Sequence, residues 1–277
     1  MPLLLLTVLA LVQGVTEFLP ISSSAHLVLT RAAWTGLGLD SAPPNPVDEL
    51  TLDVALHVGT LVAVAVYFRK DVLALIEGGF ALLRGRRDGP ARLAWLVLVA
   101  TVPAVIVGVL AKAFITEHLR GIETIAWTTL IFGILLGLAD RRPEAKTVAD
   151  LGWKGALFVG AAQALALIPG VSRSGIAMTA SRWLGLDRVD AARFSLLLAL
   201  PTIAGAGLLA TKDLMETGEA ELGADALIGA VMAFFAAYAA IFLMMRWLRH
   251  ASFMPFVVYR VALGLVLLWI AYGGPAV

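Results

Sequence analysis

A short polar segment interrupts an apolar sequence near its start. Residues 17–26 read EFLPISSSAH, in which a carboxylate and a proline are followed by three hydroxyls and an imidazole. On a helix, residues four apart share a face, so Ser22 or Ser23 would lie close to His26. A hydroxyl beside an imidazole is the minimal arrangement for nucleophilic attack, and Glu17 could orient the imidazole or accept a proton.

A second polar segment, PGVSRSGIAMT at residues 169–179, places an arginine beside a similar break. Each break is followed by a helix start, for which Ser22 and Ser172 are the expected N-caps. The free N–H groups and partial positive charge of a helix start suit an anion, and the planar guanidinium of Arg173 suits phosphate oxygens. The alternative is that Arg173 only pairs with Glu17 to stabilise the structure.

The energetic cost of these charges favours a ligand site. A charged side chain at bilayer depth costs about 2.5–3.5 kcal/mol, and Glu17, Arg173 and Arg260 all lie within or beside apolar segments. Keeping such a cluster beside two helix starts implies a ligand. For Arg260, a role in this site and pairing within the bundle both remain open. His57, four residues after Asp53, is expected to hydrogen-bond within the bundle rather than to line the cavity.

Composition defines the elements that must position these groups. The 277 residues are 60% hydrophobic and 15% charged, which predicts an all-α integral membrane protein. The absence of cysteine excludes disulfides and thiolate metal sites. A net charge of +1 gives no sign of nucleic-acid binding.

Apolar runs predict six transmembrane helices and two broken pairs. The six spans lie near 52–68, 93–114, 122–139, 191–210, 224–247 and 253–271. The broken pairs are 3–34, interrupted at Pro20, and 155–184, interrupted at Pro169-Gly170. Because a second limb of about 13 residues rises only about 20 Å, both pairs are predicted to be re-entrant helical hairpins.

An internal repeat relates the two hairpins. Gln13, Ser22 and Ser24 recur 150 positions later as Gln163, Ser172 and Ser174. The chain is therefore predicted to be a single membrane domain, 1–277, with a first repeat at 1–139 and a second at 152–273. Each repeat would hold one hairpin and three spans. Since three is odd, the second repeat would have inverted topology, and the two hairpin tips would meet near the membrane midplane.

The distribution of Lys and Arg predicts the orientation. Under the six-span interpretation most of them gather on one side, at 69–92, 141–154, 182–193 and 246–249. Basic loops usually face the cytoplasm, so both termini are expected on the exterior side.

Three motifs carry a resemblance to a known family. QGVTEFLPISSSAH, PGVSRSGIAMT and the late SFMPFVVYR resemble the bacterial undecaprenyl-pyrophosphate phosphatases, also called the bacitracin-resistance protein family. The resemblance runs through essentially the whole chain. It implies hydrolysis of undecaprenyl pyrophosphate to the monophosphate and inorganic phosphate, dependence on a divalent metal, and an active site that opens to the exterior (periplasmic) side of the bacterial cytoplasmic (inner) membrane.

The resemblance also implies roles for individual residues. Ser23, His26 and Glu17 fall on catalytic positions, and Glu17 is also the expected metal ligand. The expected substrate-binding residues are Arg173, Ser22, Ser172, Ser174, Thr179 and Gln13. Relatives carry Glu or Gln at the position of Gln13, and the Gln here removes one acidic ligand.

Charge counting supports a cation as well. The helix starts and Arg173 supply about +2, against Glu17 and a pyrophosphate of about −2 to −3. Mg²⁺ or Ca²⁺, held by Glu17, phosphate oxygens and waters, would make up the difference. We expect Ser23 to attack the terminal phosphorus while His26 manages its proton. Attack by water, attack by Ser22, or phosphoryl transfer to His26 are the alternatives.

The rival function is a secondary transporter or lipid flippase for an anionic polyprenyl phosphate, since inverted repeats with broken helices are typical of transporters. A transporter needs the anion site but no nucleophile. The expected partners are the polyprenyl pyrophosphate lipid and the bilayer, without nucleic acid. The sequence is compatible with a homodimer and does not decide between one and two copies.

Overall fold

The computed structural model describes residues 2–36, 46–86, 89–217 and 223–273, and these residues form helices and no β-strand. The α-helices are α1 (Leu3–Phe18), α2 (Ser23–Gly36), α3 (Pro46–Tyr67), α4 (Arg69–Leu83), α5 (Pro90–His118), α6 (Ile122–Asp140), α7 (Trp153–Ala164), α8 (Arg173–Trp183), α9 (Arg188–Thr217), α10 (Ala224–Leu248) and α11 (Met254–Tyr272). Two single 3₁₀ turns, Val148–Asp150 and Leu165–Leu167, precede and follow α7.

Within the described residues, six helices are long and apolar enough to cross a membrane: α3, α5, α6, α9, α10 and α11. Their bounds agree with the six predicted spans to within a few residues, and the all-α prediction is confirmed. The apolar helices α1 and α7 are shorter, with α7 and its 3₁₀ turn ending at Leu167. The segment between the first two spans forms α4.

The two breaks predicted from proline occur where expected. Helix α1 ends at Phe18 and α2 begins at Ser23, while α7 ends at Ala164 and α8 begins at Arg173. At each break a serine, Ser22 or Ser172, has a positive φ, of 76° and 72° respectively. A non-glycine residue in this region of φ is strained, so the surrounding contacts must hold both turns in place.

Equivalent contacts hold the two helix pairs in the bundle. Helix α1 packs on α10, and α7 packs on α5. Both contacts are close because they pass through glycine: a Cβ atom on Gly14 would lie 2.7 Å from the Ala233 carbonyl oxygen, and one on Gly160 would lie 2.3 Å from that of Ala100. Helices α6 and α11 pair in the same way, with Gly133 against Arg260.

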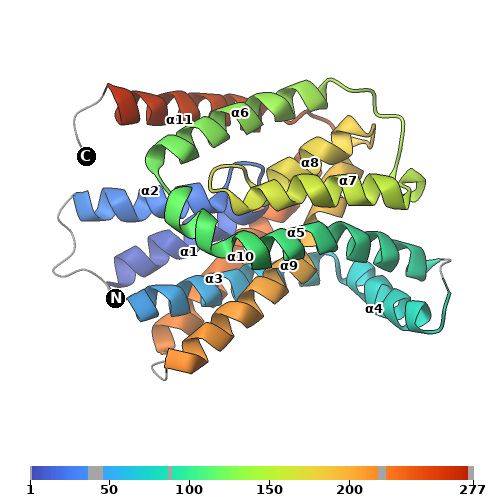
Figure 1. Ribbon diagram of the computed structural model, residues 1–277, viewed down its shortest axis with the longest axis horizontal. Coiled ribbons are helices and arrows are strands. Elements are labelled where there is room, and N and C mark those ends of the chain that lie inside the picture. Colours follow the sequence, from blue (N-terminus) through green and yellow to red (C-terminus); the bar gives the residue numbers. More distant parts are fainter. Residues whose placement is uncertain (1, 37–45, 87–88, 218–222, 274–277) are drawn as a thin grey trace.

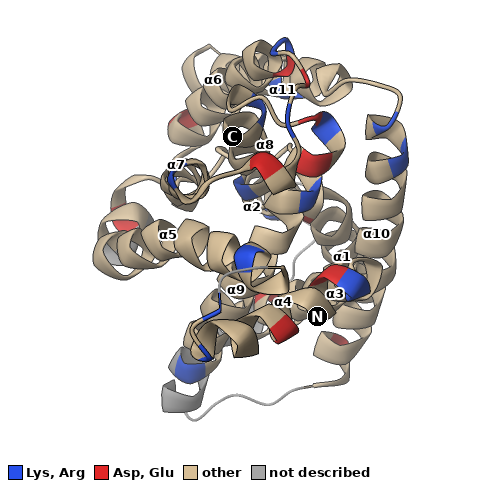
Figure 2. Ribbon diagram, turned by 90° about the vertical axis from the view of Figure 1, so that its right-hand side faces the viewer, with Lys and Arg blue, Asp and Glu red and all other residues tan. Residues whose placement is uncertain are grey.

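Figure 1 shows the consequence for the arrangement of the molecule. Helices α1 and α2 lie towards one end of the bundle, where α11 also ends. Helices α7 and α8 lie towards the other end, which holds α4. The two breaks lie next to each other near the middle (Figure 1). Figure 2 looks onto the α4 end, where Lys, Arg, Asp and Glu gather at the helix ends.

A buried carboxylate fixes the helix ends around α8. Asp140, at the end of α6, accepts hydrogen bonds from Arg188 Nε at 2.7 Å and from the backbone N–H of Phe253 at 3.1 Å. The fully buried Arg182 of α8 donates to the backbone carbonyl of Asp140 at 3.2 Å and to those of Arg142 and Leu186. These bonds join α6, α8, α9 and α11, and they orient the helix that begins at Arg173.

Candidate active site

The two breaks touch directly. The Ser174 hydroxyl, at the start of α8, donates to the backbone carbonyl of Leu19 at 2.9 Å. At the same tip Ser172 caps α8, its hydroxyl accepting from the Gly175 N–H at 3.1 Å, which confirms the predicted N-cap. Residues 155 positions apart in the sequence therefore meet where the two breaks lie.

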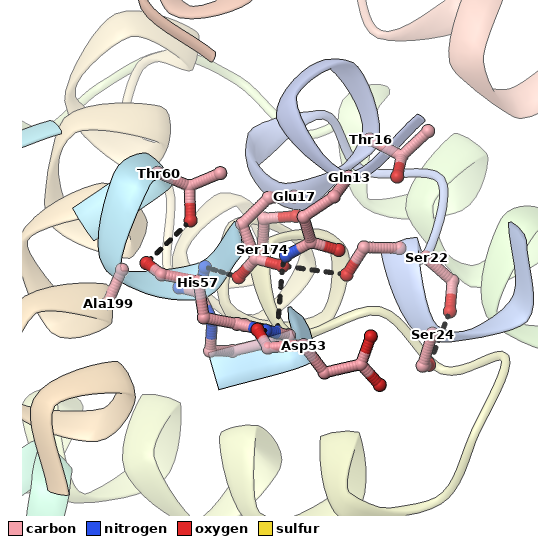
Figure 3. Close-up of polar contacts among 12 residues, drawn as sticks. Gln13, Thr16, Glu17, Ser22, Ser24, Asp53, His57, Thr60, Ser174 and Ala199 are labelled. Atoms are coloured by element: carbon pink, nitrogen blue, oxygen red, sulfur yellow. Dashed lines mark hydrogen bonds and ion pairs between the residues drawn. The ribbon is translucent and has the colours of Figure 1, made fainter. Parts of the chain in front are cut away.

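Glu17 is the centre of this region (Figure 3). Its carboxylate is buried, and its Oε2 accepts from Gln13 Nε2 at 2.9 Å and from the Ser23 hydroxyl at 2.7 Å. Its other oxygen, Oε1, accepts from Arg173 Nη2 at 3.0 Å. The structure thus joins the neighbouring Glu17 carboxylate and Ser23 hydroxyl to a guanidinium 156 residues after Glu17.

Arg173 is held at the tip by two further groups. Its Nη1 donates to the Ser195 carbonyl at 3.4 Å, and its guanidinium lies 5.8 Å from the centre of the Phe18 ring. The Ser195 hydroxyl in turn donates to the Ser174 carbonyl at 3.1 Å. The guanidinium is aimed at Glu17 and keeps donors that a phosphate could use.

The serines of the two breaks form matching pairs. The hydroxyls of Ser22 and Ser24 are 3.3 Å apart, and those of Ser172 and Ser174 are 3.2 Å apart. Among these hydroxyls and that of Ser23, the described contacts give only Ser23 a carboxylate partner. Ser23 is therefore the hydroxyl best prepared to lose a proton.

His26 makes different contacts from those expected. Its Nδ1 donates to the Ser22 carbonyl at 2.6 Å, and its Nε2 lies 2.6 Å from the hydroxyl of Tyr259, whose ring stacks on the imidazole. A carbonyl only accepts, so in the neutral ring Nδ1 carries the proton and Nε2 accepts from Tyr259. In this geometry the Ser23 hydroxyl donates to Glu17, while both ring nitrogens of His26 contact other groups.

Arg260 pairs within the bundle, which was one of the two interpretations left open by the sequence. The side chain is fully buried, and it donates to the carbonyls of Pro20 at 3.2 Å and Gly170 at 2.8 Å, one in each break. It also donates to the carbonyls of Thr128 and Thr129 on α6, at 3.4 and 3.2 Å. Arg260 thus joins the two tips.

Other residues of the motifs lie nearby without contacting Glu17. The hydroxyl of Thr179 donates to the Gly175 carbonyl at 2.7 Å within α8. Gln163, the counterpart of Gln13 in the proposed repeat, is buried, and its amide has no hydrogen-bond partner among the described residues. Substrate binding by Thr179 stays a prediction.

Two contacts around the site did not follow from the sequence. Tyr259 follows Pro255 and Phe256 in a motif of the family, but its partner His26 is 233 residues away. His57 was expected to bond within the bundle and does so through Asp53, but its Nε2 also lies 3.8 Å from Glu17 Oε2. The pairing of Arg31 with the Asp53 carboxylate, at 2.6 Å, borders the same region.

The residues around Glu17 fit a divalent cation in part. No group of three or more His, Cys, Asp or Glu side chains with metal-binding geometry occurs in the described part of the chain. However, the buried amide oxygen of Gln13 has no hydrogen-bond partner there. An unpaired buried oxygen beside a carboxylate suits a hard cation that takes its other ligands from phosphate or water.

Comparisons with known proteins identify what the whole chain is similar to. The family model described as "Bacitracin resistance protein BacA" matches residues 6–266. The chain is 50% identical over 281 residues to "Undecaprenyl-diphosphatase 1" of Rhodospirillum rubrum, covering 99% of this chain and 97% of the relative. It is 46% identical over 279 residues to "Undecaprenyl-diphosphatase" of Alteromonas mediterranea, covering 98% and 100%. To that of Hahella chejuensis it is 47% identical over 271 residues, covering 96% and 97%.

Proposed function

The chain belongs to the bacitracin resistance protein BacA family, and on this basis we propose that it hydrolyses undecaprenyl diphosphate to undecaprenyl phosphate and inorganic phosphate. The reaction would return the lipid carrier to cell-wall synthesis. The observation that carries the proposal is the contact of Glu17 with both Ser23 and Arg173. It places a prepared hydroxyl beside a phosphate-binding group.

Ser23 is the nucleophile of the proposed mechanism. As its oxygen bonds to the terminal phosphorus, the bond to the bridging oxygen breaks and undecaprenyl phosphate leaves. Glu17 Oε2, which is 2.7 Å from the hydroxyl, takes its proton. Water then cleaves the phosphoserine to release inorganic phosphate, and Glu17 returns the proton to Ser23.

The surrounding groups stabilise the transferring phosphoryl group. Arg173 offers N–H donors to its oxygens once the diphosphate displaces part of its bond to Glu17, and the start of α8 adds free backbone N–H groups. A divalent cation, Mg²⁺ or Ca²⁺, would be held by Glu17 with the Gln13 amide oxygen and phosphate oxygens, and it would neutralise charge on the diphosphate. His26 becomes available to the substrate when its bond to Tyr259 opens.

The finer architecture is part of the proposal. We infer that α1–α2 and α7–α8 are re-entrant hairpins in an inverted-topology repeat, 1–139 and 152–273. The positive φ at both break serines, the paired hydroxyls, and the matching α1–α10 and α7–α5 contacts support this arrangement. With the basic segments in the cytoplasm, the site opens to the exterior side of the bacterial inner membrane.

The proposal is tested by phosphate release from undecaprenyl diphosphate in detergent. We expect purified protein with Mg²⁺ to release phosphate and Arg173→Ala to be slower by about 100-fold or more, since this arginine stabilises developing charge. Arg120→Ala, a change at an exposed loop residue, is the matched control. Absence of release by the parent with metal supplied would instead favour the transporter, for which Ser23 has no use.

A further inference from the structure

His57 lies at the edge of the site with one ring nitrogen facing Glu17. Its Nε2 is 3.8 Å from Glu17 Oε2, and 36% of its side chain is exposed (Figure 3). The proposed mechanism gives His57 no role, and the contact joins α3 to α1 at the reacting carboxylate.

The backbone fixes which nitrogen of His57 carries a proton. Its Nδ1 lies 2.6 Å from the Asp53 carbonyl oxygen, which can only accept, so Nδ1 is the donor. In the neutral ring Nε2 therefore presents a lone pair towards Glu17. Two lone pairs facing each other repel, and a positive charge between them removes the repulsion.

The amide oxygen of Gln13 is an unpaired acceptor beside the same carboxylate. Gln13 is fully buried, its Nε2 donates to Glu17 Oε2 at 2.9 Å, and its Oε1 has no hydrogen-bond partner among the described residues. Leaving a buried oxygen unpaired is unfavourable, because its lost hydration is not replaced. The same amide thus bonds Glu17 through its nitrogen and leaves its oxygen free to bind a cation.

We propose that Glu17 Oε2, His57 Nε2 and Gln13 Oε1 form a divalent-cation site with one nitrogen ligand, which diphosphate oxygens and water complete. The proposal rests on the function proposed above. A metal bound at about 2.1 Å from each of two ligands allows a separation of up to about 4.2 Å, which includes the 3.8 Å between Nε2 and Oε2.

The neighbouring groups support this assignment. The Asp53 carboxylate is occupied by Arg31, at 2.6 and 3.2 Å, so Asp53 contributes its carbonyl to orient His57 rather than a ligand oxygen. A metal-bound histidine usually donates its other N–H to a carbonyl or carboxylate in this way. His57 thus takes the place of the carboxylate ligand that a Glu at position 13 would provide.

A nitrogen ligand changes which metals the site prefers. Imidazole favours later transition metals such as Co²⁺, Ni²⁺ or Zn²⁺ over Mg²⁺, Ca²⁺ and Mn²⁺, which prefer oxygen ligands. We therefore expect the full-length protein in detergent to bind one equivalent of Co²⁺, measured by calorimetry with and without methylenediphosphonate, a non-hydrolysable diphosphate. His57→Gln should weaken Co²⁺ binding about 10-fold or more and Mg²⁺ binding by less than about 3-fold.

His118→Gln is the matched control, because His118 also bonds the carbonyl four residues before it but lies at the exposed end of α5. It should bind Co²⁺ like the parent. Equal Co²⁺ affinity of parent and His57→Gln would overturn the proposal and would fit an imidazolium that pairs with Glu17. No Co²⁺ binding by the parent under either condition would also overturn it.

Phosphate release in Mg²⁺, measured in parallel, separates this proposal from the proposed function. If the parent releases phosphate but its Co²⁺ binding does not depend on His57, the proposed nitrogen ligand is wrong and the proposed phosphatase activity stands. If Co²⁺ binding depends on His57 but the parent releases no phosphate, the proposed phosphatase activity is wrong and the proposed metal site stands.

Discussion

One hydrogen bond distinguishes Ser23 from the hydroxyls beside it. Ser22 and Ser24 face each other, whereas Ser23 donates to the carboxylate of Glu17. A carboxylate can take the proton as the oxygen attacks, while a neighbouring hydroxyl cannot. The structure therefore favours Ser23 over Ser22 as the nucleophile.

Replacing Ser23 tests this assignment. We expect Ser23→Ala to lower kcat for phosphate release by about 10³-fold or more, and Ser22→Ala to have a much smaller effect, since only the first removes the attacking atom. Steady-state rates with Mg²⁺ would be compared with Thr211→Ala, whose hydroxyl bonds the Gly207 carbonyl of its own helix. If Ser23→Ala keeps most of its turnover, direct attack by water replaces the serine mechanism.

Sequence spacing predicted the members of this site but not all of its bonds. The positions of Glu17, Ser23 and His26 followed from one helix turn and a proline, which are local properties. The partner of His26 depends on α11, which brings Tyr259 onto the imidazole. Such a contact follows from the packing of distant helices, and spacing within one segment contains no information about it.

Helix α11 carries Arg260, whose side chain connects the two breaks. The Arg260 guanidinium satisfies carbonyls at Pro20 and Gly170 that have lost their helical partners at the breaks. A Cβ atom on Gly175 would lie 2.8 Å from Arg260 Nη1, so α8 leaves little room for the group to move. Stability and site geometry therefore depend on the same residue.

We expect Arg260→Gln to lower both stability and activity. The shorter amide cannot reach both breaks, and each buried carbonyl left unpaired costs about 1–3 kcal/mol. Thermal unfolding in detergent should show a clearly lower Tm, accompanied by slower phosphate release. Arg249→Gln, at an exposed residue after α10, should match the parent. An unchanged Tm would show that other contacts align the tips.

The elements themselves were largely predictable. Long apolar runs mark the six spans because a helix in lipid must cover about 30 Å, and Pro20 and Pro169 mark the breaks because proline cannot continue the hydrogen-bond pattern. The choice of neighbours was not predictable in the same way. Gly14 meets α10 and Gly160 meets α5 through close backbone approach, which requires three-dimensional matching of two surfaces.

For the molecule as a whole, the charged helix ends indicate how it sits in the membrane. The start of α1 and the end of α11 lie at the same end of the bundle, and α4 and the connection from α6 to α7 lie at the opposite end (Figure 1). The basic residues of these connections would face the cytoplasm under the charge rule.

A cysteine-free chain allows a direct test of this orientation. Glu123 and Arg141 are exposed residues at the two ends of α6. In intact cells, we expect a membrane-impermeant thiol reagent to label Glu123→Cys but to label Arg141→Cys only after permeabilisation. The parent, without a thiol, controls for background. The reverse pattern would place the site on the cytoplasmic side.

Because one site is formed by distant segments of the chain, the order of synthesis determines when the site can be complete. Glu17 and Ser23 emerge early in translation, but Arg173 follows Glu17 by 156 residues and Arg260 comes later still. A nascent chain that has inserted only its first helices therefore carries Glu17 and Ser23 without Arg173. We expect the complete site to form only after the last helix, which carries Arg260, has docked.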